Sequence, residues 1–297
     1  MAKQAWNGQT GGTHGMQRAL VWWVRHLGLS AGYNLTHFWH IWYIFTRPNA
    51  RNAAYRYHRR RGRSRWQAAF DVYRSFYRMG VMLIDRFAVY GGYQFDVTVE
   101  HEERYNKQLE HPEGFVLMFS HIGNSEMAAY TMSTQARRMH VLVYGGESGV
   151  VMEQRARVLE QNNIGMITVQ PNDMSHIFAI NEVLQRGEVL AVAGDRRWGD
   201  KTIDCTVLGA QAPLPAGVFQ LCATLRCAIV LPFVFKEQGN RYRIIVEEIR
   251  VNEALPRNER AADLAQQFAD LLTKHTQAHP YDWFNFYDFW NEGVNGK

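Results

Sequence analysis

The chain has 297 residues, a formal net charge of +5 and many aromatic side chains, which permits one large α/β domain or two small ones with an ample core. Its three cysteines, Cys205, Cys222 and Cys227, form no CxxC pair and leave an odd thiol. This pattern argues against a zinc site or a disulfide framework and indicates a reducing compartment. The first residues lack the pattern of an export signal, so we expect the chain to stay in the cytoplasm.

The N-terminal quarter of the chain is strongly basic. Residues 1–80 contain 13 lysines and arginines but a single acid, whereas the remaining chain has a net charge of −7. Eight arginines lie between positions 47 and 65, and three of them are consecutive: Arg59, Arg60 and Arg61. The preceding residues 27–46 carry no formal charge and many aromatic side chains, among them Trp39, Trp42 and Phe45.

An uncharged run of this length could cross a bilayer. Its polar residues, glycines and aromatic side chains fit the headgroup boundary better than the hydrocarbon centre. We therefore predict that residues 1–90 form a helical, basic membrane-docking region, with one helix in the cytoplasmic leaflet and the arginines on anionic lipid. Two alternatives stay open: a buried core helix followed by a solvated charged face, and a nucleic-acid-binding arm.

The most informative motif follows the apolar run 115–120, which predicts a strand buried on both faces. His121 comes next, then a turn with Asn124, and a helix is predicted from Glu126 onward. Five positions along a helix leave two side chains about 140° apart, so His121 belongs on the turn, and Glu126 can reach back toward it. A base whose ring is held by a carboxylate can take a proton from a hydroxyl or amine. The alternative is a purely structural histidine and a capping carboxylate.

Strand-like and helix-like stretches alternate from residue 115 to the C-terminus. This alternation predicts an α/β domain over residues 91–297, with a mainly parallel central sheet flanked by helices. Catalytic groups in such sheets gather at the carboxyl ends of the strands. The predicted strands cover residues 115–120, 141–144, 165–169, 189–193, 228–235 and 242–247, and the predicted helices cover residues 126–130, 153–162, 176–185, 218–225 and 261–277.

Two further loops carry plausible chemistry. The strand 189–193 leads into Asp195, Arg196 and Arg197, which places a carboxylate and two guanidiniums on a loop expected to open beside His121, where an arginine could clamp a phosphate. Prolines and Gly217 precede the predicted helix 218–225, whose free N-terminal amides can bind an anion. Taken alone, each loop also fits an ordinary charged loop or a proline-stopped turn.

The order and spacing of four sequence blocks resemble those of the bacterial lysophospholipid acyltransferase superfamily, in the branch of the lipid A biosynthesis acyltransferases. The blocks are Ser120–Glu126, Gly194–Arg196, Leu208–Gly217 and Leu231–Pro232. Residues 18–61 resemble the membrane-docking front of that family, and residues 280–290 resemble a terminal block of a less characterised subgroup. The resemblance covers residues 18 to 290.

The resemblance implies an acyltransferase at the cytoplasmic face of the bacterial inner membrane, peripheral or monotopic. The donor would be an acyl thioester on acyl carrier protein or coenzyme A, and the acceptor a hydroxyl or amine of a lipid or glycolipid. His121 would be the general base and Glu126 the group that orients and charges it. Substrate binding is assigned to Asn124, Asp195, Arg196, Arg197 and Gly217, with Arg196 on the acceptor phosphate or the oxyanion. No metal, tightly bound cofactor or nucleic acid is expected.

Two other functional classes stay open. An aminoacyl transferase of the same fold would pass glycine or a similar group from a carrier protein to a lipid. A non-catalytic lipid or nucleic-acid binder would keep its function without His121.

Overall fold

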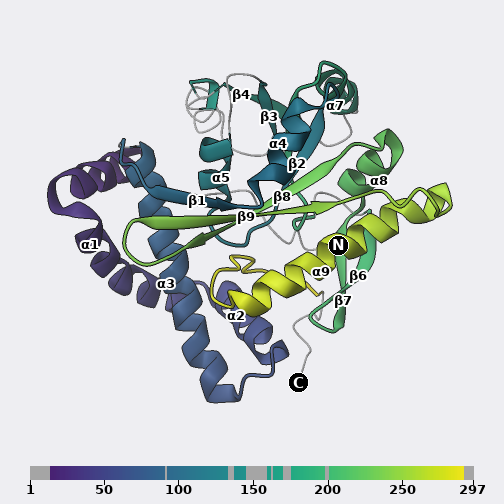
Figure 1. Cartoon of the computed structure of the whole chain (residues 1–297). Coiled ribbons are helices and arrows are strands. Elements are labelled where there is room, and N and C mark those ends of the chain that lie inside the picture. Colours follow the sequence, from purple (N-terminus) through teal and green to yellow (C-terminus); the bar gives the residue numbers. More distant parts are fainter. Residues whose placement is uncertain are drawn as a thin grey trace.

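A seven-stranded sheet lies at the centre of the computed structural model, with strand order β1-β9-β8-β2-β5-β3-β4 (Figure 1). The structure describes residues 14–90, 92–132, 137–144, 159–161, 163–169, 175–197 and 201–290. Neighbouring strands run parallel, except that β9 is antiparallel to β8. The strands are β1 (Asp96–Glu100), β2 (Phe115–Phe119), β3 (Met139–Tyr144), β4 (Ile164–Val169), β5 (Val189–Ala193), β8 (Ile229–Lys236) and β9 (Arg241–Ile249). The predicted α/β class and mainly parallel sheet are confirmed.

Helices cover both faces of this sheet. Val116 and Met118 of β2 point into one hydrophobic core with residues of α7, α8 and α9, whereas Phe115 and Leu117 point into a second core with residues of α5. A strand buried on both faces requires a continuous apolar run, which explains why β2 was recognisable in the sequence. The helices around the sheet are α4 (Glu102–Glu110), α5 (Ser125–Met132), α7 (Ser175–Gln185), α8 (Ala216–Leu225) and α9 (Arg257–Ala278). The predicted helix 153–162 falls largely outside the described residues.

A separate two-stranded antiparallel ribbon, β6 (Thr202–Val207) and β7 (Ala210–Pro215), lies beside α9. Val207 and Leu214 of the ribbon are completely buried in the core that α8 and α9 share. The free thiols of Cys205 and Cys222 are also buried there.

Three helices form the N-terminal region: α1 (His14–Thr46), α2 (Pro48–Arg60) and α3 (Arg65–Tyr90). Gly28 interrupts α1 with φ 79° and ψ 169°, a left-handed φ that glycine adopts without steric cost. Gly80 lets α1 and α3 approach closely, because a Cβ at that position would lie 2.9 Å from the Cβ of Thr36. Among the described residues, no helix has the length and apolar character needed to cross a membrane.

A buried carboxylate connects these helices to the sheet. Asp85 of α3 accepts hydrogen bonds from the hydroxyls of Tyr33 and Tyr242, each at 2.5 Å, and Lys236 lies 3.0 Å from the same carboxylate. Asp85 is fully buried, and a buried carboxylate is tolerated only when it is paired and hydrogen-bonded. The network therefore fixes α1 and α3 against β8 and β9.

Candidate active site

Sheet register brings two candidate residues together at the carboxyl ends of neighbouring strands. Phe119 of β2 pairs with Ala193 of β5, and His121 and Asp195 each lie two residues beyond that pair. The amide of Gly194 donates to the Phe119 carbonyl at 2.9 Å, which extends the pairing by one step. His121 and Asp195 therefore leave the sheet side by side, although 74 residues separate them in the sequence.

The carboxylate of Asp195 holds the imidazole of His121 at two points. Its Oδ1 lies 2.6 Å from Nδ1 of the ring, and its Oδ2 accepts the backbone N–H of His121 at 2.8 Å. The Asp195 side chain is completely buried, whereas 28% of the His121 side chain is exposed. A carboxylate at Nδ1 fixes the proton on that nitrogen, so Nε2 is left as the basic nitrogen.

Burial lowers the pKa of His121 below its ordinary value, and the negative charge of Asp195 opposes this effect. The positive charges of Arg196 and Arg86 lower the His121 pKa further. Burial alone would raise the pKa of Asp195, but interaction with His121 outweighs it and keeps that pKa below its usual value. The neutral imidazole beside an ionised carboxylate is the form in which a general base accepts a proton.

Glu126 was predicted to orient and charge the His121 ring, which stays a prediction, but the structure places a different carboxylate on Nδ1. The hydrogen-bond partner of Nδ1 is Asp195. Glu126, in the first turn of α5, forms an ion pair with Arg86 of α3, with 2.7 Å between Oε2 and Nε. Sequence proximity favoured Glu126, whereas the register between β2 and β5 brings the more distant carboxylate to the ring.

The turn after His121 is pressed against β8. Gly123 has φ +68°, and a Cβ there would lie 1.7 Å from the Val234 carbonyl oxygen, so only glycine fits. Asn124 is buried, its backbone N–H donates to the Val234 carbonyl at 3.0 Å, and its Nδ2 donates to the Tyr242 hydroxyl at 3.3 Å. Asn124 thus fixes the turn, and its substrate-binding role stays a prediction.

A family model described as bacterial lipid A biosynthesis acyltransferase matches residues 71–292 of this chain. The chain belongs to this family. Its membership confirms the resemblance drawn from the sequence blocks and identifies an acyltransferase family that acts on lipids. The matched range includes His121, Glu126 and Asp195. No curated protein shows a significant match to the chain.

The arginines predicted to bind substrate of this acyltransferase lie directly after Asp195. Arg196 donates through Nε to Oδ1 of Asn285 and through Nη2 to the Phe284 carbonyl, each at 3.3 Å. Burial lowers the pKa of Arg196, and Asp195 opposes that effect. Arg197 follows and is partly buried. Arg196 is therefore engaged with Phe284 and Asn285, and its contact with a substrate stays a prediction.

Gly217, the other predicted acceptor contact of the acyltransferase, lies in the first turn of α8 and is exposed. A Cβ at this position would meet no atom within 4 Å. Helix α8 packs into the core on one face of the sheet, whereas α5, which carries Glu126, packs on the other face. The role of Gly217 in binding the acceptor stays a prediction.

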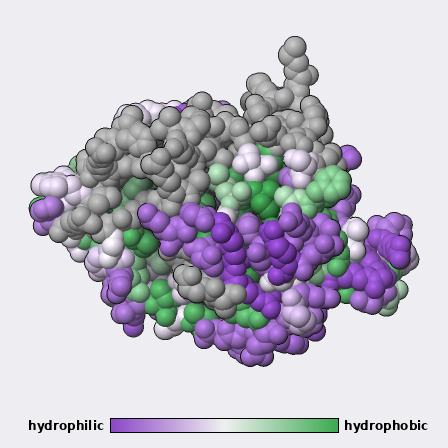
Figure 2. All heavy atoms as spheres, turned by 90° about the horizontal axis from the view of Figure 1, so that it is seen from above, coloured by the Kyte–Doolittle hydropathy of each residue, from purple (hydrophilic) through white to green (hydrophobic). Residues whose placement is uncertain are grey.

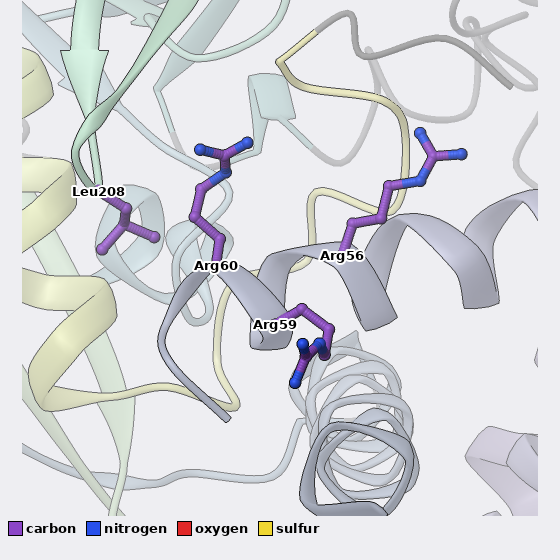
Figure 3. A pocket seen from close by; sticks show the side chains of 4 residues that line it. All are labelled: Arg56, Arg59, Arg60 and Leu208. Atoms are coloured by element: carbon purple, nitrogen blue, oxygen red, sulfur yellow. The ribbon is translucent and has the colours of Figure 1, made fainter. Parts of the chain in front are cut away.

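The three consecutive arginines at the end of α2 differ in environment, and the third of them, Arg61, is the C-cap residue of the helix. Arg59 is exposed and donates to the Arg63 carbonyl, whereas Arg60 lies over the Trp290 ring at 4.6 Å and Arg61 over the Tyr57 ring at 5.7 Å. An open cavity of about 390 Å³ borders this helix. Figure 3 shows Arg56 and Arg60 pointing to one side of α2 and Arg59 to the other. The cavity is lined by Arg56, Arg59, Arg60 and Leu208.

Large apolar side chains are exposed on α1 and α3 of the acyltransferase. The three predicted docking residues are among them: Trp39, Trp42 and Phe45 are 51%, 56% and 73% exposed. The sequence analysis missed two more on α3, Trp66 at 88% and Phe70 at 57%. By contrast, hydrophilic side chains dominate the described part of the face seen in Figure 2.

Proposed function

We propose that this member of the family moves an acyl group from a thioester donor to a hydroxyl or amine of a lipid or glycolipid at a membrane surface. The observation that carries the proposal is the His121–Asp195 pair, in which a buried carboxylate orients a partly exposed imidazole at the end of β2. The same pairing that fixes the Nδ1 proton leaves Nε2 able to accept a proton from an acceptor.

In the proposed reaction, Nε2 of His121 takes the proton as the acceptor oxygen or nitrogen attacks the thioester carbonyl. The tetrahedral intermediate carries a negative charge on oxygen, which backbone amides or an arginine of the 195–197 loop stabilise. The carbon–sulfur bond then breaks, and the imidazolium returns its proton to the leaving thiolate. The products are the acylated acceptor and the free thiol of the carrier. No covalent enzyme intermediate is required.

The proposed donor is an acyl thioester of acyl carrier protein or of coenzyme A. A carrier protein is typically acidic, so the basic N-terminal region would attract it. We assign acceptor binding to Asn124, Arg196, Arg197 and Gly217, and the positively charged arginine fork suits an acceptor that bears a phosphate.

The proposed location is the cytoplasmic face of the inner membrane. Exposed tryptophan and phenylalanine side chains on α1 and α3 suit insertion at the headgroup level. Arginines between residues 47 and 65 would add about 1 kcal/mol each where they lie close to anionic lipid. Both features support peripheral or monotopic attachment.

Incubation of the purified protein with a lipid extract and one labelled donor at a time tests this function. The donors are acyl carrier protein charged with a fatty acyl group, acyl coenzyme A, and a carrier charged with glycine. We expect mass spectrometry to find a new acylated lipid with one of the acyl donors. Transfer from the glycine-charged carrier alone would replace the proposal with aminoacyl transfer, and no new lipid with any donor would overturn it.

A further inference from the structure

A short C-terminal segment, residues 282–287, runs beside the turn that carries His121. The backbone N–H of Phe284 donates to the His121 carbonyl at 2.8 Å, and the N–H of Gly123 donates to the Asp282 carbonyl at 2.6 Å. Between these bonds, Ile122 and Trp283 form an antiparallel bridge. The segment therefore fixes the backbone on which the imidazole is mounted.

Two side chains of the same segment hold Asp195. Nδ2 of Asn285 lies 3.4 Å from Oδ2 of Asp195, and the hydroxyl of Tyr287 donates to the Asp195 carbonyl at 2.9 Å. Asn285 is only 6% exposed. Both members of the His121–Asp195 pair are therefore contacted by one stretch of chain that is about 90 residues distant from Asp195.

The neighbours of Asn285 allow its amide only one orientation. A guanidinium donates hydrogen bonds and never accepts them, and an ionised carboxylate only accepts them. Oδ1 of Asn285 must therefore face Nε of Arg196, at 3.3 Å, and Nδ2 must face Asp195. The amide thus lies between a cation and an anion: its oxygen accepts from Arg196, and its nitrogen donates to Asp195.

The segment is anchored on both sides. Trp283 is buried against Tyr57 of α2, with ring centroids 5.1 Å apart, and Phe286 stacks on Phe76 of α3 at 4.5 Å. The carboxylate of Asp282 accepts two hydrogen bonds from Arg78. Because well-packed side chains seldom move, these anchors make the segment a rigid support.

We infer that residues 282–287 position the His121–Asp195 pair, and that Asn285 and Tyr287 act as positioning residues. The segment holds the His121 turn through its backbone and the Asp195 loop through these two side chains. The inference rests on the proposed role of His121 as general base, but it concerns the geometry of the pair and can be measured without turnover.

Two variants and one control test the inference. Asn285→Asp replaces the donor to Asp195 by a carboxylate, and Tyr287→Phe removes only the hydroxyl. Asn252→Asp, the control, adds the same charge on an exposed loop. The readouts are kcat and KM, thermal unfolding, the NMR titration of the His121 ring and its Nδ1–H signal, assigned with His121→Gln.

The charged groups around the His121 ring set the expected sign. Asp195 and Arg196 face the ring from the loop after β5, and Arg86 faces it from α3. Arg86 is itself paired with Glu126 of α5. A second carboxylate beside Asp195 favours the imidazolium, so Asn285→Asp should raise the His121 pKa by about one unit. Misplacement of the pair should lower kcat by at least about tenfold. KM should stay within about twofold, because the variant removes no proposed substrate contact.

Tyr287→Phe should weaken or shift the Nδ1–H signal, and the control Asn252→Asp should leave that signal and the His121 titration unchanged. The inference is overturned if Asn285→Asp and Tyr287→Phe both retain the native titration, Nδ1–H signal and kcat. Should Asn285→Asp not fold, Tyr287→Phe decides alone through the Nδ1–H signal. Absence of transfer in the native protein would refute the proposed function, while the NMR results would still decide the inference.

Discussion

Asparagine in place of Asp195 should invert the protonation of the His121 ring. Oδ2 of Asp195 accepts the backbone N–H of His121 at 2.8 Å and faces Nδ2 of Asn285 at 3.4 Å. Both groups are donors, so the amide oxygen of the new side chain must take the Oδ2 position. Its NH₂ group then points at Nδ1, which must become the acceptor. The ring proton consequently moves to Nε2, the nitrogen that should act as base.

The size of the loss follows from the cost of restoring the active tautomer. A lost neutral hydrogen bond costs about 0.5–1.5 kcal/mol and an unmatched buried donor about 1–3 kcal/mol. Together they amount to about 1.5–4.5 kcal/mol, or a factor of about 10 to 2,000. Loss of the carboxylate charge beside the imidazolium, worth about one pKa unit, adds about tenfold. We therefore expect kcat to fall by about 10²–10⁴, similar to the loss known for an inverted histidine tautomer.

Comparison with Asp195→Ala gives this prediction its sharpest test. Alanine leaves the tautomer of His121 undetermined, whereas asparagine dictates the inactive one. Steady-state transfer assays and thermal unfolding should show Asp195→Asn folded and no more active than Asp195→Ala, although asparagine is closer in shape to aspartate. A folded Asp195→Asn protein that keeps more than about a tenth of the native kcat would refute the reasoning.

Three further outcomes follow. Burial lowers the pKa of His121, and the base acts unprotonated. As the pH increases, kcat/KM should therefore rise through a pKa below about 6.5 and be level at neutral pH. A rise centred above pH 7 in the pH–rate profile would contradict this. Glu126→Gln should lose less than about tenfold in kcat, since Asp195 holds the ring; a loss equal to that of Asp195→Asn would show a more direct role. High salt should extract only a minority of the native protein from membranes, because a Debye length of about 3 Å at 1 M screens charges but not inserted rings. Replacing three exposed aromatic side chains with serine should make the protein extractable by high salt. These side chains are Trp39, Trp42 and Phe45. Complete release of the native protein by salt would contradict the insertion of these rings.

The sequence predicted the sheet well where a strand is buried on both faces. The run 189–193 coincides with β5, and the run 115–120 differs from β2 by one residue. The sequence analysis missed β1, which is half exposed. It also missed the ribbon of β6 and β7, whose second strand contains two prolines. Proline usually ends a strand, but a two-stranded ribbon has edges at which the missing N–H is tolerated.

The sequence analysis identified His121 and the loop at Asp195 but did not pair the ring with Asp195. From local geometry alone, Glu126 was the carboxylate nearest to His121 along the chain. The pairing of Phe119 with Ala193 decides the outcome, and strand order cannot be obtained from one sequence. Asn285 and Tyr287 carry no local signal for the same reason, because their contacts with Asp195 depend on the path of the C-terminal segment.

The single-turnover rate of transfer by His121→Ala tests the central claim most directly. The variant should be compared with the native protein at equal folded concentration, on the same vesicles and with the donor that the native protein uses. Loss of a positioned general base should reduce the rate by about 10²–10⁴, with unchanged membrane binding. A folded His121→Ala protein that transfers at nearly the native rate would contradict the account.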